Sequence, residues 1–153
     1  MRTFKELNRD DLVIYVTRWS FKKVLNELEE NEEVKAMTQT HSGISNVFIT
    51  NKRIMIRKNP VWLGLGDNRD IAYSDIEKNS ITNTFIDNLR FNAKGLQFVI
   101  CDEKFRFQNL LKELMAEDEK RRKKVKQLEE KIKKMKDDGY NVDELEESLE
   151  FME

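Results

Sequence analysis

The alternation of apolar and polar residues changes twice along the chain and predicts three segments. Between residues 4 and 32, apolar side chains recur every three or four positions, which is the spacing of amphipathic helices. We therefore expect one or two helices here, with Ser20 as the N-cap of the second. The residues that follow this spacing are Leu12, Val13, Val16, Trp19, Phe21, Val24, Leu25 and Leu28.

From Val34 to about Gln108 the apolar period shortens to two, which indicates β-strands. Turn signals such as Ser42-Gly43 and Lys94-Gly95 separate the runs. Short strands with short connections favour an antiparallel meander, in a sheet that is strongly twisted or closed into a barrel. The expected strands lie at 34–41, 45–50, 53–58, 69–74, 76–86, 89–101 (as a broken run) and 104–108.

The stretch VFITNKRIMIRKN, residues 47–59, predicts a β-hairpin whose two strands meet at a tight turn. Asn51 is expected there because it tolerates the left-handed conformation that tight turns often require. We expect Arg53, directly after the turn, to make a structural hydrogen bond or ion pair. Arg57 and Lys58, beyond the core of the hairpin, are the candidate contacts for an anionic partner.

Helical spacing returns after the last strand, with Asn109 as the expected N-cap and an apolar face that covers one end of the sheet. A heptad seam follows, Gly139 ends the helix, and Asn141 caps the next one, which together predict an αα-hairpin. The expected helical contact consists of Val125, Leu128, Ile132, Met135, Leu145 and Leu149. The predicted domains are 1–32 (N-terminal helices), 33–116 (β domain with its capping helix) and 117–153 (charged hairpin).

Charge divides this hairpin into two opposite blocks. Residues 120–136 carry ten Lys or Arg and two Glu, whereas residues 137–153 carry eight Asp or Glu and no base. Single exposed ion pairs contribute only about 0–1 kcal/mol, but the block pattern specifies which helix pairs with which. Pairing within one chain and pairing between two chains would both satisfy it.

Composition and charge argue against several classes of protein, including membrane-spanning and disulfide-rich proteins. The 153 residues carry a formal net charge of −1, so no overall field favours nucleic acid or anionic lipid. Apolar runs such as 96–101 are too short to cross a bilayer. The single cysteine excludes an internal disulfide framework and a multi-cysteine metal site. We expect a cytoplasmic protein, no cofactor and no resident metal.

Candidate catalytic residues are few. His41 lies beside a turn, and the sequence offers no nucleophile and acid to complete a triad with it. Cys101 ends an apolar strand and precedes two acids, which oppose a reactive thiolate. The basic run 120–126 could contact phosphates, but the acidic block that follows argues against nucleic acid as a partner. We therefore predict that the protein is not an enzyme, and no class of small-molecule ligand is indicated.

The connection 59–68, NPVWLGLGDN, is the most unusual loop of the chain. It places Trp62, Leu63 and Leu65 in a segment that should run over the surface. Two interpretations remain open. Trp62 folds back over the end of the β domain, or the three residues form an exposed apolar patch that meets a partner or a membrane.

The β segment resembles the bacterial PH-like domain, specifically the YokE-like group. The residues that carry the resemblance are ISNVFITNKRIMI (44–56), IAYSDIEKNSI (71–81) and KGLQFVICDEKFRFQNLLKEL (94–114). The tail, LEEKIKKMKDDGYNVDELEESLEFM (128–152), looks like the short C-terminal helical hairpin often appended to such proteins. It has acids where that motif usually has a basic stretch.

The resemblance implies an α+β protein, with a PH-like antiparallel barrel or sandwich capped by a C-terminal helix and flanked by helices. It implies a non-enzymatic binding or scaffold domain that acts through protein–protein contacts, with the hairpin mediating self-association or docking. The alternative is peripheral binding to anionic membranes through the Trp62 loop and its neighbouring basic residues.

Overall fold

The computed structural model describes residues 1–62, 65–84 and 87–152, and the chain divides into two compact units. The first runs from Met1 to Met115 and the second starts at Ala116. The N-terminal helices therefore belong to the same compact unit as the strands.

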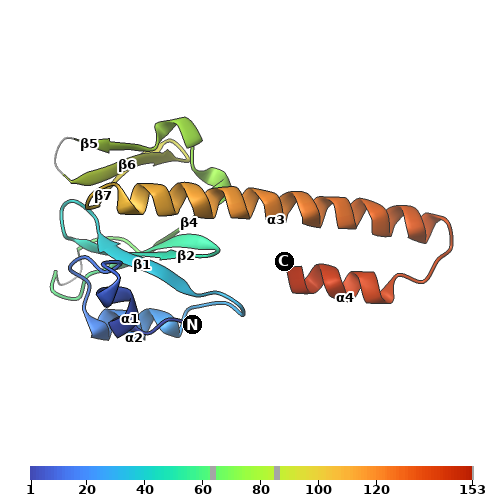
Figure 1. Cartoon of the computed structure of the whole chain (residues 1–153), viewed down its shortest axis with the longest axis horizontal. Helices are drawn as coiled ribbons and strands as arrows, with labels where there is room; N and C mark the ends of the chain where they lie inside the picture. Colours follow the sequence, from blue (N-terminus) through green and yellow to red (C-terminus); the bar gives the residue numbers. More distant parts are fainter. Residues whose placement is uncertain (63–64, 85–86, 153) are drawn as a thin grey trace. The chain divides into compact units, whose positions relative to one another are not determined.

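The first unit is α+β, as the sequence predicts (Figure 1). Two short helices precede a four-stranded antiparallel sheet of order β1-β2-β3-β4 and a three-stranded antiparallel sheet of order β5-β6-β7. Within the described residues the strands form these two sheets and no closed barrel. The bounds are α1 (Phe4–Arg9), α2 (Arg18–Leu25), β1 (Val34–Gln39), β2 (Ser45–Thr50), β3 (Arg53–Lys58), β4 (Arg69–Ala72), β5 (Thr82–Thr84), β6 (Asn88–Ala93) and β7 (Leu96–Cys101).

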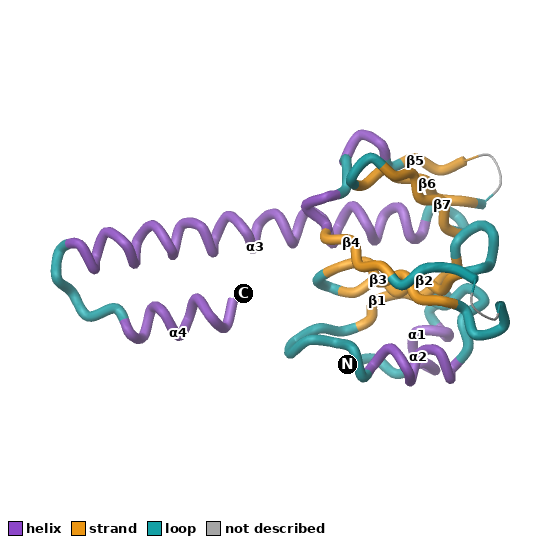
Figure 2. Tube along the Cα trace, turned by 180° about the vertical axis from the view of Figure 1, so that it is seen from behind, coloured by secondary structure: helices purple, strands orange, loops and turns teal. Residues whose placement is uncertain are grey.

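The larger sheet is covered by apolar side chains on both faces. On one face Val47 and Ile49 of β2 belong to a core that also includes Phe91 of β6 and Phe107. The helices α1 and α2 lie beside the other face of this sheet (Figure 2). There Phe48 packs in a second cluster with residues of these helices. All six positions of β2 are therefore buried, which explains why 47–49 reads as a continuous apolar run rather than as an alternation.

The N-terminal segment corrects two predictions. Leu12 and Val13 are not helical, because Asp11 and Tyr15 adopt positive φ angles of 57° and 61° that interrupt a helix. Val13 instead forms a parallel bridge to Met37 of β1. The N-cap of α2 is Thr17, whose side chain accepts a hydrogen bond from the N–H of Ser20 at 3.2 Å.

The strand predicted at 104–108 is wrong, because the long helix α3 (Arg106–Asp137) begins there. The cap is the carboxylate of Asp102, which accepts hydrogen bonds from the N–H of Phe107 at 2.8 Å and of Gln108 at 3.2 Å. Asn109 lies inside the helix and is not its N-cap. The strands predicted at 69–74 and 76–86 end or begin differently, because 3₁₀ turns occupy Tyr73–Asp75 and Lys78–Ser80. Residues 85 and 86 of the second prediction lie outside the described residues.

The second unit contains the rest of α3 and helix α4 (Asp143–Met152). Gly139 follows α3 with a φ of 83°, which a glycine adopts without steric cost. The side chain of Asn141 accepts a hydrogen bond from the N–H of Asp143 at 3.0 Å, as expected of a cap. Neither α3 nor any other described helix is long and apolar enough to cross a membrane.

Candidate functional site

The turn after β2 is a structural junction. The Arg53 guanidinium donates two hydrogen bonds to the carboxylate of Glu32, each 3.0 Å long, and a third of 2.8 Å to Asp70. The Glu32 side chain is fully buried, so Arg53 supplies the charge that lets it stay ionised there. The prediction that Arg53 has a structural role is confirmed.

Further hydrogen bonds hold the same junction together. The Thr50 hydroxyl donates to Glu32 at 2.7 Å, and the Tyr73 hydroxyl donates to the carbonyl oxygens of Thr50 and Arg53. Burial of the Glu32 carboxyl raises its pKa, but hydrogen bonds from Arg53, from the Glu29 N–H and from Thr50 outweigh burial, so its pKa lies below the ordinary value. The hydrogen bonds between Arg53 and Glu32 also raise the pKa of the Arg53 guanidinium.

Asn51 contributes through its side chain rather than through a left-handed backbone, since its φ is not positive. Its amide oxygen accepts from the N–H of Glu33 at 2.8 Å, and its amide nitrogen donates to the carbonyl of Asn31 at 2.9 Å. Its partner Asn31 has the left-handed backbone instead, with a φ of 61°. The predicted role of Asn51 was therefore wrong, and the residue ties the turn to the loop that leads into β1.

The two cations proposed for an anionic partner differ in their surroundings. Arg57 donates to Glu27 at 3.0 Å and pairs with Asp70 at 2.8 Å, and only 16% of its side chain is exposed. Its charge is therefore already neutralised within the fold. Lys58 ends β3 with its side chain exposed, so Lys58 is the more accessible of the two.

The loop after β3 carries an exposed apolar surface. Val61 is 76% exposed, Trp62 46% and Leu65 55%, whereas Leu63 lies outside the described residues. A Trp62 that covered the core would lose nearly all of its exposed surface. The observed exposure favours the patch over the covering interpretation.

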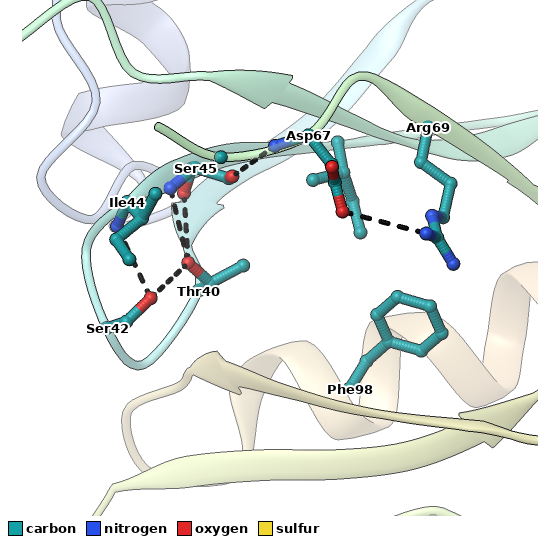
Figure 3. A pocket seen from close by; sticks show the side chains of 9 residues that line it. Thr40, Ser42, Ile44, Ser45, Asp67, Arg69 and Phe98 are labelled. Atoms are coloured by element: carbon teal, nitrogen blue, oxygen red, sulfur yellow. Dashed lines mark hydrogen bonds and ion pairs between the residues drawn. The ribbon is translucent and has the colours of Figure 1, made fainter. Parts of the chain in front are cut away.

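A hollow of about 360 Å³ lies between this loop, the β1–β2 turn and β7 (Figure 3). The hydroxyls of Thr40 and Ser42 lie 3.2 Å apart on one side. Opposite them, Arg69 pairs with Asp67 at 3.6 Å and places its guanidinium 5.8 Å from the ring centre of Phe98. The described lining offers hydroxyl groups, a carboxylate and a guanidinium, which can form hydrogen bonds with a small polar molecule. Sequence reasoning missed this hollow because its residues come from distant segments.

Three further features bear on metal binding and catalysis: acidic, His and Cys clusters, the thiol of Cys101, and His41. No group of three or more His, Cys, Asp or Glu residues there could hold a metal ion. Burial, and secondarily the charge of Glu103, raises the pKa of the Cys101 thiol, which keeps it protonated and poorly nucleophilic. His41 is exposed at the hairpin turn, where its backbone N–H donates to Val99 at 2.9 Å.

The predicted helical contact is only partly covered. Ile132 of α3 is buried, as is Val142 just before α4, and Lys136 forms an ion pair with Glu146. The other predicted contact residues keep intermediate exposure: Val125, Leu128, Met135, Leu145 and Leu149. The seam of the hairpin therefore retains apolar surface that is available to another helix.

A comparison with models of known protein families finds no match, and a comparison with curated proteins finds none either.

Proposed function

We propose that the chain is a non-enzymatic, PH-like binding or scaffold module whose C-terminal hairpin associates with a second copy. The strand order of four plus three, followed directly by a helix that packs Phe107 and Leu111 into the core, supports the PH-like assignment. Of the stretches quoted for the family resemblance, 44–56 covers β2 and β3, 71–81 covers the end of β4 and two 3₁₀ turns, and 94–114 covers β7 and the start of α3.

The half-buried seam of the hairpin carries the proposal of self-association. At 1.5 Å per residue, the ten residues of α4 span about 15 Å, whereas α3 continues for about 33 Å beyond Ala116. One α4 therefore covers less than half of that length, and Val125 and Leu128 keep exposed apolar surface. The opposite charge blocks allow pairing with another copy as well as within one chain, because each copy offers both a basic and an acidic helix.

Light scattering of the full chain tests this proposal. We expect a mass at least twice the 18.3 kDa of one chain, and a rise of about tenfold or more in the dissociation constant when Val125 and Leu128 are both changed to serine. Gln127→Ser, an exposed neighbour on the same helix, is the matched control. A wild-type chain that stays monomeric at high concentration, with helicity intact by circular dichroism, would contradict the proposal.

The exposed loop favours a second candidate function, which is peripheral binding to anionic membranes. Val61, Trp62 and Leu65 could enter the headgroup region while Lys58 contacts lipid phosphates. In co-sedimentation with vesicles containing phosphatidylserine, Trp62→Ala should reduce the bound fraction severalfold. Trp19→Ala, which removes the other exposed tryptophan (59% exposed), should leave it unchanged. Equal binding by both variants and the wild type would exclude this function.

A further inference from the structure

The two N-terminal helices enclose an open cleft that the sequence does not reveal. Its volume is about 500 Å³, and its floor is formed by Phe4 of α1 with Phe21 and Leu25 of α2. The rings of Phe4 and Phe21 lie 5.9 Å apart, centre to centre. Phe21 is buried, whereas Phe4 and Leu25 keep part of their surface exposed to the cleft. The cleft can therefore accept one more large apolar side chain.

Cations surround this apolar floor. Lys5, Arg18 and Lys22 line the cleft and are exposed, and within the described residues none of them has an ion pair with a carboxylate. The guanidinium of Arg18 lies 5.7 Å from the ring centre of Phe4. Arg2, in contrast, is already paired with Asp10. Unpaired cations beside an apolar floor favour an occupant that combines an apolar side chain with negative charge.

The outer face of α4 has this combination. Phe151 is 79% exposed, and the exposed acids Glu144, Glu147 and Glu150 accompany it on the same helix. Glu147 precedes Phe151 by four positions and Glu144 by seven, so both lie on its face. Leu149 and Phe151 are two positions apart and therefore point in different directions. Docking of Phe151 leaves the seam of the hairpin free.

We propose that the acidic outer face of α4 in one copy docks in the α1–α2 cleft of a second copy, with Phe151 placed between Phe4 and Leu25. This inference rests on the proposed function, because it makes the hairpin the element that associates, but it uses the opposite face of α4. When two copies do not dock reciprocally in each other, a contact between two different surfaces is heterologous and continues into rings or open chains. Screening by salt should weaken the assembly, since charge contributes to it.

Light scattering of full-length variants tests the contact. Phe151→Ser should raise the dissociation constant of the higher assembly by about tenfold or more, because a buried aromatic anchor carries much of the energy of an interface. Tyr140→Ser is the matched control, since Tyr140 is an aromatic residue of the same unit that is 64% exposed. This control should assemble like the wild type.

Charge reversal identifies the two surfaces. Lys22→Glu and Glu147→Lys should each weaken the higher assembly, and an equimolar mixture of the two variants should restore it, because the reversed cleft of one meets the reversed helix of the other. If the higher assembly survives Phe151→Ser and both reversals while the Val125 and Leu128 double variant dissociates, this inference is overturned and the proposed function stands. If the wild type itself is monomeric, both fail.

Discussion

Replacing Arg53 with alanine is expected to lower the free energy of unfolding by about 3–5 kcal/mol, because the change leaves the buried carboxylate of Glu32 without its partner. For a chain of this length, each kcal/mol corresponds to about 2–4 °C in Tm. Thermal unfolding monitored by circular dichroism measures the shift. Lys58→Ala, on the same strand but with an exposed side chain, is the control and should change Tm by less than about 2 °C.

The same pair predicts a dependence on pH. The pKa of Glu32 is lower in the folded chain than in the unfolded chain, so its contribution is present above the unfolded value of about 4.3. That contribution is lost as the pH falls through the folded pKa. Wild-type stability should therefore decline below about pH 4 more steeply than that of Arg53→Ala. Parallel stability profiles for the two proteins would show that Arg53 does not hold Glu32 ionised.

The second large effect is expected at Phe107. Its ring is fully buried in the core between the sheets and fixes the first turn of α3 to the β domain. Phe107→Ala should cost about 3–5 kcal/mol, because it removes buried apolar surface and leaves a cavity. Denaturant unfolding measures the loss as a lower midpoint.

Phe105 supplies the matched comparison two residues earlier. It is 59% exposed, and its φ of 60° is equally unfavourable for phenylalanine and for alanine. Phe105→Ala should therefore shift the midpoint by less than about 0.5 kcal/mol. Equal losses from the two variants would contradict the assignment of Phe107 as the anchor of α3.

The hairpin at the centre of the fold could be predicted from sequence because its signals are local. The apolar runs in 45–50 and 53–58 and the polar turn between them fall within fourteen residues, and β2 and β3 match those bounds. The helix end at Gly139 and the cap at Asn141 could be predicted for the same reason.

The wrong secondary-structure predictions fall where a side-chain cap or a positive φ angle decides the backbone conformation. Phe105 and Phe107 alternate like strand residues, but Asp102 caps a helix at that place. Leu12 and Val13 follow helical spacing, yet the positive φ of Asp11, a non-glycine residue, ends α1 before them. A short pattern cannot reveal either effect, because spacing describes which side chains share a face and not which backbone conformation is adopted.

For the candidate surfaces too, features set by neighbouring residues could be predicted and features set by distant residues could not. The exposed apolar loop at Trp62 could be located from its composition alone. The neutralisation of Arg57 could not, because its partners Glu27 and Asp70 lie 30 and 13 positions away along the chain. The α1–α2 cleft was missed because Phe4 and Phe21 meet only after residues 10–17 have folded back.

Because β2 is buried on both faces, its sequence is uncharged, and this raises the risk of aggregation before the chain has folded. Residues 44–50, ISNVFIT, contain no charge and no proline, and such segments pair readily between unfolded chains. Lys52 and Arg53 follow at once, and Arg57 and Lys58 end the next strand. Charges that flank an apolar segment oppose intermolecular pairing. We therefore expect Arg53 to act at two stages: before folding its charge opposes pairing of the strand with other chains, and after folding it stabilises the buried carboxylate of Glu32.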